Sequence, residues 1–210
     1  MLDTMNFGGV HVVQAAKDLA QIHAPECAGV LWQRDVATDV QMWIDTLDPT
    51  RLPHARMILR PSAVPEALDQ VPEALDHLCD IAGAGPCPAR QWLQDDIAAL
   101  STCFSDLMQT AYLRLRLDVV TTNSCSKFHL DAMNARLICT YRGTGTQYGV
   151  LTDAAVPDQI FTVPTGSPMI LRGSKWPEVP VVGLRHRSPP ISGTGESRLV
   201  LVLDPMDAAA

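Results

Sequence analysis

The C-terminal half of this chain is built from short β-rich segments, and this pattern restricts the fold more than any other feature. From residue 112 onward, apolar and β-branched runs recur, separated by Gly, Pro, Ser and Asp. About seven short strands at this spacing are typical of a sandwich, a barrel or a jelly roll. The segments expected to form strands are 112–122, continuing into 126–131, and then 136–141, 159–163, 168–172, 181–186 and 197–204.

The first half of the chain has mainly helical patterns. An apolar stripe with steps of three and four residues runs through 89–110 and predicts a helix with one buried face. Residues 36–47 show similar spacing, and short strands are expected at 29–34 and 56–60. We therefore predict an α+β protein. Its mainly helical N-terminal region, 1–110, would pack on a β-rich core formed by 111–206.

The composition limits the classes of partner. There are 16 Lys and Arg against 23 Asp and Glu, a formal net charge of −7, without the basic stripe of nucleic-acid-binding proteins. No apolar run approaches the roughly 18 residues of a membrane span, and the N-terminus lacks a secretory signal pattern. The six cysteines form no CxxC pair, which suits a reducing compartment. We expect a cytoplasmic protein that binds neither nucleic acid nor membranes.

The segment CSKFHLDAMNARLICTYRGTGTQYG, residues 125–149, contains the main candidate site. On an extended chain, His129 and Asp131 would share one face with Cys125 and Lys127. A row of buried ionisable side chains is unfavourable unless a partner neutralises it, and a metal ion is such a partner. His-x-Asp alone is a weak signal, so its context has to support a metal site.

Two residues farther along the chain supply that context. His186 ends a later β-segment, and Arg198 opens the last apolar one. This order resembles the 2-His-1-carboxylate triad of non-haem iron(II) oxygenases that use 2-oxoglutarate and are built on the double-stranded β-helix, a jelly-roll fold. The resemblance covers about residues 112–204 and implies that His129, Asp131 and His186 bind iron(II) and act in catalysis. It further implies that Arg198 pairs with a carboxylate of the 2-oxoglutarate cosubstrate.

Neighbouring polar residues are candidates for further contacts. Tyr141 and Thr140 are expected near the cofactor, and Arg136 and Lys127 near the substrate. Arg136 also fits an ordinary ion pair or a supporting contact to the carboxylate. Lys127 lies near the strand entrance, from which its side chain can reach solvent. Cys125 would lie about 13 Å from His129 along an extended strand, so a free thiol is expected unless the chain bends.

A second resemblance spans most of the chain. The strings CSKFHLDAMNARLICTYRGTGTQY, ILRGSKWP and HRSPP…RLVLVLD are similar to a bacterial family designated domain of unknown function 1826. That resemblance implies no established reaction. Its members are often encoded beside zinc-handling proteins, which implies a link to metal homeostasis. The main alternative is therefore a zinc-binding protein of the same fold, and a third is a cupin-like binding module without a metal.

The motif residues also have ordinary structural interpretations. His129 and Asp131 could form only a buried hydrogen-bonded pair, and His186 could be a solvated loop residue. Arg198 could lie on the surface, paired with Glu196 or Asp204. In these alternatives, His186 and Arg198 lie away from the His129–Asp131 pair. A metal site instead requires both imidazoles and the carboxylate to converge on one point.

The sequence contains one rival candidate metal site. His77, Cys79 and Cys87 combine ligand types that bind zinc, but their spacing does not match a standard zinc pattern. The substrate is expected to be a small molecule or a peptide, and the sequence does not indicate an oligomeric state.

Overall fold

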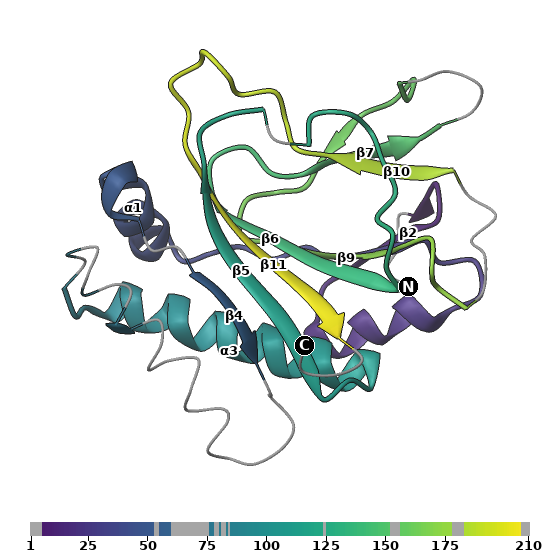
Figure 1. The fold of residues 1–210 in the computed structure, drawn as a ribbon, viewed down its shortest axis with the longest axis horizontal. Coiled ribbons are helices and arrows are strands. Elements are labelled where there is room, and N and C mark those ends of the chain that lie inside the picture. The colour runs from purple at the N-terminus through teal and green to yellow at the C-terminus, as the bar shows by residue number, and fades with distance from the viewer. Residues whose placement is uncertain are drawn as a thin grey trace.

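The computed structural model describes residues 6–52, 55–59, 76–77, 80, 83, 85–123, 125–151, 156–177 and 183–206. Within this part of the chain, one eight-stranded and one three-stranded sheet are joined with helices into a sheet-rich mixed fold (Figure 1). None of the helices in the described ranges is long and apolar enough to cross a membrane.

The two sheets are formed by strands that are far apart in sequence. The large sheet has the order β1-β2-β3-β9-β6-β11-β5-β4, and the small sheet β10-β7-β8. The large-sheet strands are β1 (Asn6–Phe7), β2 (Val10–Val13), β3 (Gly29–Trp32), β4 (Ala55–Leu59), β5 (Tyr112–Val120), β6 (Ala135–Arg142), β9 (Pro168–Arg172) and β11 (Arg198–Met206). The small-sheet strands are β7 (Gln147–Val150), β8 (Phe161–Thr162) and β10 (Leu184–Arg187). The helices are η1 (Ala16–His23), α1 (Thr38–Thr46), η2 (Pro49–Arg51) and α3 (Pro88–Met108).

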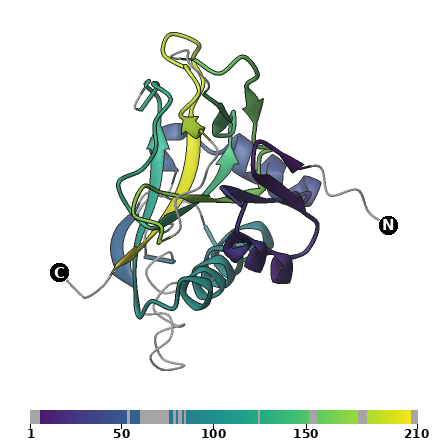
Figure 2. The same cartoon turned by 90° about the vertical axis from the view of Figure 1, so that its right-hand side faces the viewer.

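The large sheet separates two apolar layers. Alternate residues of β11 project to opposite faces. Leu199, Leu201 and Leu203 pack among the helices, whereas Val200 and Val202 face the small sheet. Both faces of this strand are therefore covered, which explains its nearly continuous apolar sequence. Figures 1 and 2 show α3 and the small sheet on opposite sides of the large sheet.

Strand β5 shows how the sequence assigns these two faces. Leu113, Leu115 and Leu117 are completely buried toward the helical layer. The intervening residues Arg114 and Arg116 project from the other face of the sheet, as the alternation of a strand requires. One side of β5 therefore stabilises the core, and the other leaves charged groups beside the space between the sheets.

Helix α3 confirms the sequence prediction for residues 89–110. Its buried stripe includes Leu93, Ile97, Leu100 and Phe104. The helix begins with Pro88 in its first turn, where the missing N–H costs nothing. It ends before Gln109, which has a left-handed φ of +49°.

Several sequence predictions differ from the structure. Residues 126–131 do not form a strand, and the segment predicted at 159–163 is a strand only at Phe161–Thr162. The short strands β1, β2 and β7 were not predicted, because two to four residues carry too little periodicity. The N-terminal half thus adds four strands to the large sheet besides its helices. The boundary at residue 110 falls between α3 and β5, and the division into two regions stays a prediction.

A nearly buried ion pair joins the helical layer to the large sheet. Both terminal guanidinium nitrogens of Arg34 donate to the carboxylate of Asp96 on α3, each at 2.6 Å. The hydroxyl of Tyr141 on β6 donates to the same carboxylate, also at 2.6 Å. Burial and the Asp96 charge raise the pKa of Tyr141 well above its usual value, so this hydroxyl remains a donor. Strand β6 and the connection that follows β3 are thereby fixed to one carboxylate of α3.

Replacing this carboxylate should destabilise the fold. We expect Asp96→Asn to lower the free energy of unfolding by about 3–5 kcal/mol, because it leaves a largely buried guanidinium unpaired. Tyr141→Phe should cost about 1 kcal/mol, the usual value of one hydrogen bond. Urea denaturation measures both. The neighbouring Asp95→Asn is the control and should change stability by less than about 0.5 kcal/mol. Equal effects at positions 95 and 96 would contradict this role.

Candidate metal centre

His129 and Asp131 lie in the connection between β5 and β6, and not on a regular strand. A single β-bridge joins His129 to His186 of β10. The two backbones exchange N–H···O hydrogen bonds of 3.0 and 3.1 Å. The chain bends at Cys125, whose φ is +55°. The predicted alternation along an extended strand was therefore wrong, and the bridge and the bend place the His-x-Asp pair instead.

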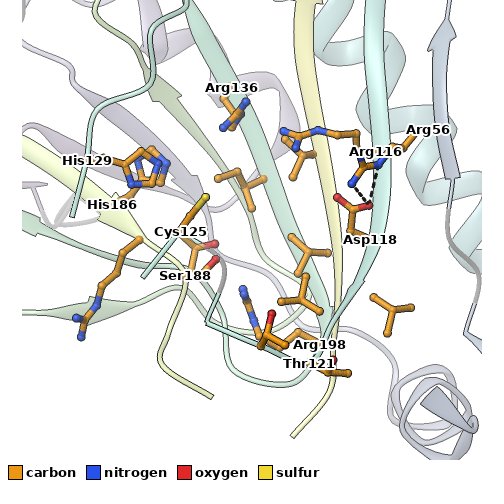
Figure 3. A pocket seen from close by; sticks show the side chains of 18 residues that line it. Arg56, Arg116, Asp118, Thr121, Cys125, His129, Arg136, His186, Ser188 and Arg198 are labelled. Atoms are coloured by element: carbon orange, nitrogen blue, oxygen red, sulfur yellow. Dashed lines mark hydrogen bonds and ion pairs between the residues drawn. The ribbon is translucent and has the colours of Figure 1, made fainter. Parts of the chain in front are cut away.

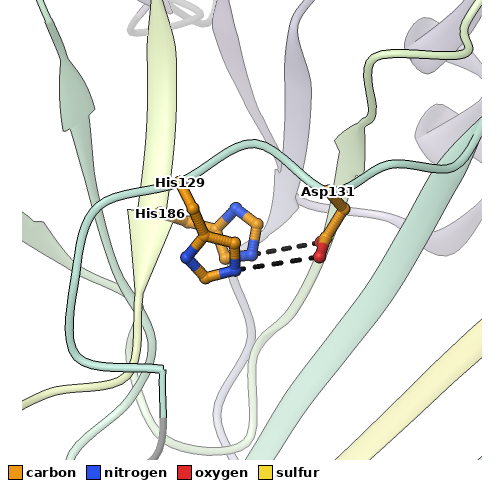
Figure 4. A group of neighbouring side chains, drawn as sticks. All are labelled: His129, Asp131 and His186. Carbon is orange, nitrogen blue, oxygen red and sulfur yellow. Dashed lines mark ion pairs between the residues drawn. The ribbon is translucent and has the colours of Figure 1, made fainter.

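The three predicted ligands converge. Nε2 of His186 lies 3.2 Å from Oδ2 of Asp131, and Nε2 of His129 lies 3.7 Å from Oδ1 (Figure 4). The two imidazole rings are 4.4 Å apart between centroids. One potential ligand atom from each residue lies within 4.8 Å of the others, and this is the metal-binding arrangement found among the described residues. Sequence positions 129, 131 and 186 thus meet at one place.

The surroundings set the protonation of these groups. Burial lowers the pKa of His186 despite the opposing charge of Asp131, which favours the neutral imidazole that a metal requires. Burial alone would raise the pKa of Asp131, but the contacts to His186 and Arg136 outweigh it and the net pKa is lowered. The carboxyl is therefore ionised at neutral pH, as a ligand must be.

The tautomer of His129 is fixed by a backbone contact. Its Nδ1 lies 2.9 Å from the carbonyl oxygen of Lys127. Because a carbonyl only accepts hydrogen bonds, Nδ1 must carry the proton in this contact, which leaves the Nε2 lone pair directed to the cluster. A contact of this kind is typical of histidines that bind metals through the other nitrogen.

The site fits a cation. Oδ2 of Asp131 is buried and has no hydrogen-bond partner among the described residues, although Nε2 of His186 lies 3.2 Å from it. A buried carboxylate oxygen without a donor, facing two imidazole nitrogens, is unfavourable unless a positive ion joins them. Two imidazoles and one carboxylate suit iron(II) or zinc, and three protein ligands leave further positions open.

Residues outside the cluster hold Asp131 in place. Arg136 donates to Oδ1 of Asp131 at 2.7 Å. Its remaining nitrogens donate to both oxygens of Asp204 on β11, at 2.6 and 3.0 Å. Arg136 thus lies between two carboxylates, in the supporting contact that the sequence left open, and it also lines the cavity described next. Its predicted contact with substrate stays a prediction.

A cavity of about 360 Å³ lies beside the cluster and is lined by both His129 and His186. Apolar side chains of Ile138, Val200 and Val202 form part of its wall. Figure 3 shows the two histidines on one side of the cavity and Arg198 at one end.

Arg198 is buried in this cavity with 1% of its surface exposed. Its guanidinium donates to the carbonyl of Thr144 at 2.6 Å and to the hydroxyl of Thr140 at 3.3 Å. Among the described residues, no carboxylate lies within ion-pair distance of it. Burial accordingly lowers the pKa of Arg198 to about 10, although Glu196 partly opposes this. The alternatives of surface pairing with Glu196 or Asp204 do not describe its position, since Asp204 binds Arg136 and Arg116.

The other predicted site residues have different surroundings. Thr140 contacts Arg198, but Tyr141 faces the helical layer and binds Asp96, so its predicted cofactor contact has no support in the structure. The side chain of Lys127 is exposed and does not line the cavity. Cys125 is a free, exposed cysteine on the cavity wall and is not part of the ligand cluster.

The rival zinc site at His77, Cys79 and Cys87 stays a prediction. Cys79 lies outside the described residues. The sulfur of Cys87 accepts a hydrogen bond from the backbone of Arg90 at the start of α3. Residues that sequence reasoning missed are Arg56 and Arg116 on the cavity wall. The alternation of Arg114, Arg116 and Asp118 with buried leucines could have indicated a charged face.

A family model described as "Protein of unknown function (DUF1826)" matches residues 14–204. The chain belongs to this family. A comparison with curated proteins finds no match.

Solved structures with some similarity to this DUF1826 protein include three oxygenases. The rice dioxygenase for auxin oxidation is 13% identical, with a TM-score of 0.46, covering 91% of this chain and 78% of the other. An oxidoreductase of the 2OG-Fe(II) oxygenase family from Burkholderia pseudomallei is 15% identical, with a TM-score of 0.46 and coverages of 93% and 92%. The Arabidopsis thaliana dioxygenase for auxin oxidation 1, in complex with 2-oxoglutarate, is 10% identical, with a TM-score of 0.48 and coverages of 93% and 90%. At these sequence identities and TM-scores, the similarity supports no functional conclusion. Any such conclusion has to rest on the side chains of the site.

The cluster should bind one divalent ion per chain of this DUF1826 protein. We expect His129→Ala, His186→Ala and Asp131→Ala to abolish that binding, measured by anaerobic calorimetry and metal analysis. Arg136→Gln should weaken it by about 10–100-fold, because residues that orient a ligand have effects of that size. His11→Ala is the control, since His11 contacts Gln21 instead. Unchanged affinity in the three ligand variants would refute the site.

The cysteines should differ strongly in reactivity. Burial raises the pKa of Cys27 to about 11 and of Cys139 to about 12, whereas Cys125 is exposed. In a Cys79→Ser background at pH 8, we expect Cys125 to react with a disulfide reagent at least about 100-fold faster than the two buried thiols, because only thiolates react. Cys125→Ser should remove the fast phase. If the fast phase persists in the Cys125→Ser variant, the assignment of the fast-reacting thiol to Cys125 is wrong.

Proposed function

We propose that this protein is a non-haem iron(II) oxygenase that uses 2-oxoglutarate. The observation that supports this most is the position of Arg198. A buried guanidinium, with no carboxylate partner in the part of the chain that the structure describes, lines the same cavity as two of the three convergent candidate ligands. An arginine fork pairs well with a carboxylate, and a cosubstrate carboxylate would supply the missing negative charge.

The strand arrangement is consistent with a double-stranded β-helix. Two sheets face each other across an apolar layer that contains Met169 and Val202 of the large sheet and Tyr148 of the small one. The proposed ligands come from the β5–β6 connection and from β10 of the small sheet, and the anchoring arginine from β11 of the large sheet. Side chains from both sheets thus meet in the space between them, where small folds of this class hold ligands.

The residues of the chain have separate tasks in this proposal. The iron(II) would be held by His129, Asp131 and His186. Together with 2-oxoglutarate it would supply the dioxygen activation needed to oxidise a substrate, and 2-oxoglutarate would be converted to succinate and CO₂. Arg198, held by the Thr144 carbonyl and the Thr140 hydroxyl, would orient the cosubstrate. The apolar wall around Val200 and Val202 would exclude water from that end of the cavity.

The zinc-binding alternative uses the same three ligands and is distinguished by Arg198. A protein that only stores or senses zinc does not need an unpaired buried cation beside its metal. Such a cation costs free energy on burial, and burial of Arg198 is what lowers its pKa to about 10. We therefore favour the oxygenase and treat zinc binding as an outcome that the next experiment separates.

With iron(II) present and oxygen excluded, 2-oxoglutarate should bind and raise the unfolding temperature of the wild-type protein. Arg198→Gln should weaken this binding by about 10–100-fold, the range expected for losing a hydrogen-bonded charge pair, and should leave metal affinity unchanged. Arg198→Lys should restore part of it. Calorimetry measures binding, and succinate formation in air measures turnover.

The control for this experiment is Arg185→Gln. Arg185 also lies on a strand near the site but does not line the cavity, so its loss removes the same charge without the proposed contact. Tight zinc binding with no response to 2-oxoglutarate in any variant would reject the oxygenase in favour of a zinc protein. Equal loss in the Arg185 and Arg198 variants would reject Arg198 as the anchor.

A further inference from the structure

The walls of the site are strongly basic in an otherwise acidic chain. The cavity beside the histidines and a second cavity next to it share Arg56, Arg116 and Arg136. Together they are lined by six of the chain's 16 basic residues, although its net charge is −7. Among the described lining residues, only Asp118 and Asp204 are acidic. The six are Arg56, Arg114, Arg116, Arg136, Arg187 and Arg198.

Three of these arginines form one cluster on neighbouring strands. Arg56 of β4 is directly opposite Arg116 of β5 in the sheet register, and Arg114 lies two residues along the same face. We call Arg56, Arg114 and Arg116 the arginine cluster. Like charges placed directly opposite each other across strands destabilise a sheet. Such a cost is offset when an anion binds between them.

The cluster also has unused hydrogen-bond donors. Nε of Arg116 is buried without a hydrogen-bond partner, and its Nη2 reaches Asp204 only at 3.4 Å. Arg56 contacts Asp118 at 3.5 Å. For Arg114, the described residues provide no ion pair. The nearby Arg136 is by contrast held by three contacts of 3.0 Å or less to carboxylates. The contacts of the cluster are longer and fewer, so its donors are freer than those of Arg136 to bind a ligand.

The cluster and the metal ligands belong to one connected site. Asp204 accepts from Arg116 and from Arg136, and Arg136 in turn holds Asp131. Figure 3 shows Arg56 and Arg116 across the cavity from His129 and His186. The cavity volume of about 360 Å³ is near the lower end of the usual range for small-molecule sites. A ligand that spans this space would be small.

We infer that the substrate is a small molecule carrying an oxyanion group, a carboxylate or a phosphate, which the arginine cluster binds while the remainder of the molecule extends toward the metal ligands. Arginine forks match both groups geometrically and electrostatically. As a statement about a substrate, this rests on the proposed oxygenase function. As a statement about an anion site, it can be tested without metal, cosubstrate or turnover.

Inorganic phosphate is the probe, titrated into the full-length, chelator-treated protein at constant ionic strength maintained with chloride. We expect saturable binding by calorimetry and a rise in unfolding temperature. The double variant Arg56→Gln/Arg116→Gln should weaken binding at least about ten-fold, since each lost contact is a charge-assisted hydrogen bond. Arg185→Gln, the matched control outside both cavities, should bind phosphate like the wild type.

A second variant separates this site from the proposed cosubstrate anchor. Arg198→Gln should keep phosphate binding at the cluster while 2-oxoglutarate binding is weakened by about 10–100-fold. Should the double variant fail to fold by circular dichroism, Arg114→Gln, which alters an exposed residue, replaces it. Two results would overturn the inference. One is a phosphate titration that gives the same signal as a titration with chloride. The other is phosphate binding that disappears in Arg198→Gln but persists in the cluster variants. If phosphate binds at the cluster but the protein does not turn over 2-oxoglutarate, the oxygenase proposal is rejected and the anion site is retained.

Discussion

The candidate metal centre depends on one short backbone interaction. The paired hydrogen bonds between His129 and His186 fasten the β5–β6 connection to the small sheet. They align this connection with the strand that carries His186, while Arg136 holds Asp131 from the large sheet. Because both imidazoles leave the same bridge, their rings lie 4.4 Å apart between centroids, tilted by 49°, and face the carboxylate from one side. The bridge thus sets the positions of the two histidines relative to each other.

The large sheet provides the rigid support behind this bridge. Strands β6, β11 and β5 are adjacent and covered by helices on one face, which leaves their other face for the site. Arg136, Asp204 and Arg116 come from these three strands in that order and form a continuous row of charge contacts. Charge near the metal ligands is therefore anchored to the best-packed part of the protein.

Much of this arrangement could be predicted from sequence, for identifiable reasons. The stripe of α3 and the alternation of β5 are long enough for periodicity to be clear. His129, Asp131 and His186 were identified because their types and order resemble a known metal-binding triad. Their actual placement was not predictable, because a single bridge and a positive φ at Cys125 have no periodic signal.

The errors for individual side chains have a simple physical origin. On β6, Thr140 and Tyr141 are neighbours and therefore project to opposite faces. Only one of them could contact the cavity, and Tyr141 instead binds Asp96 among the helices. The arginine cluster was missed because its members come from β4 and β5, whose pairing no local pattern specifies.

The β5–β6 connection has a consequence for how this family can diverge. Two ligands are carried by a segment that contributes little to either apolar layer, since His129 and Asp131 are only partly buried. An insertion or deletion in that segment would abolish chelation while the sheets and helices persisted. Descendants of such a protein could keep the scaffold and lose the chemistry in one mutational event. Intact residues at these three positions are thus a sharper marker of a retained candidate metal site than overall resemblance between sequences.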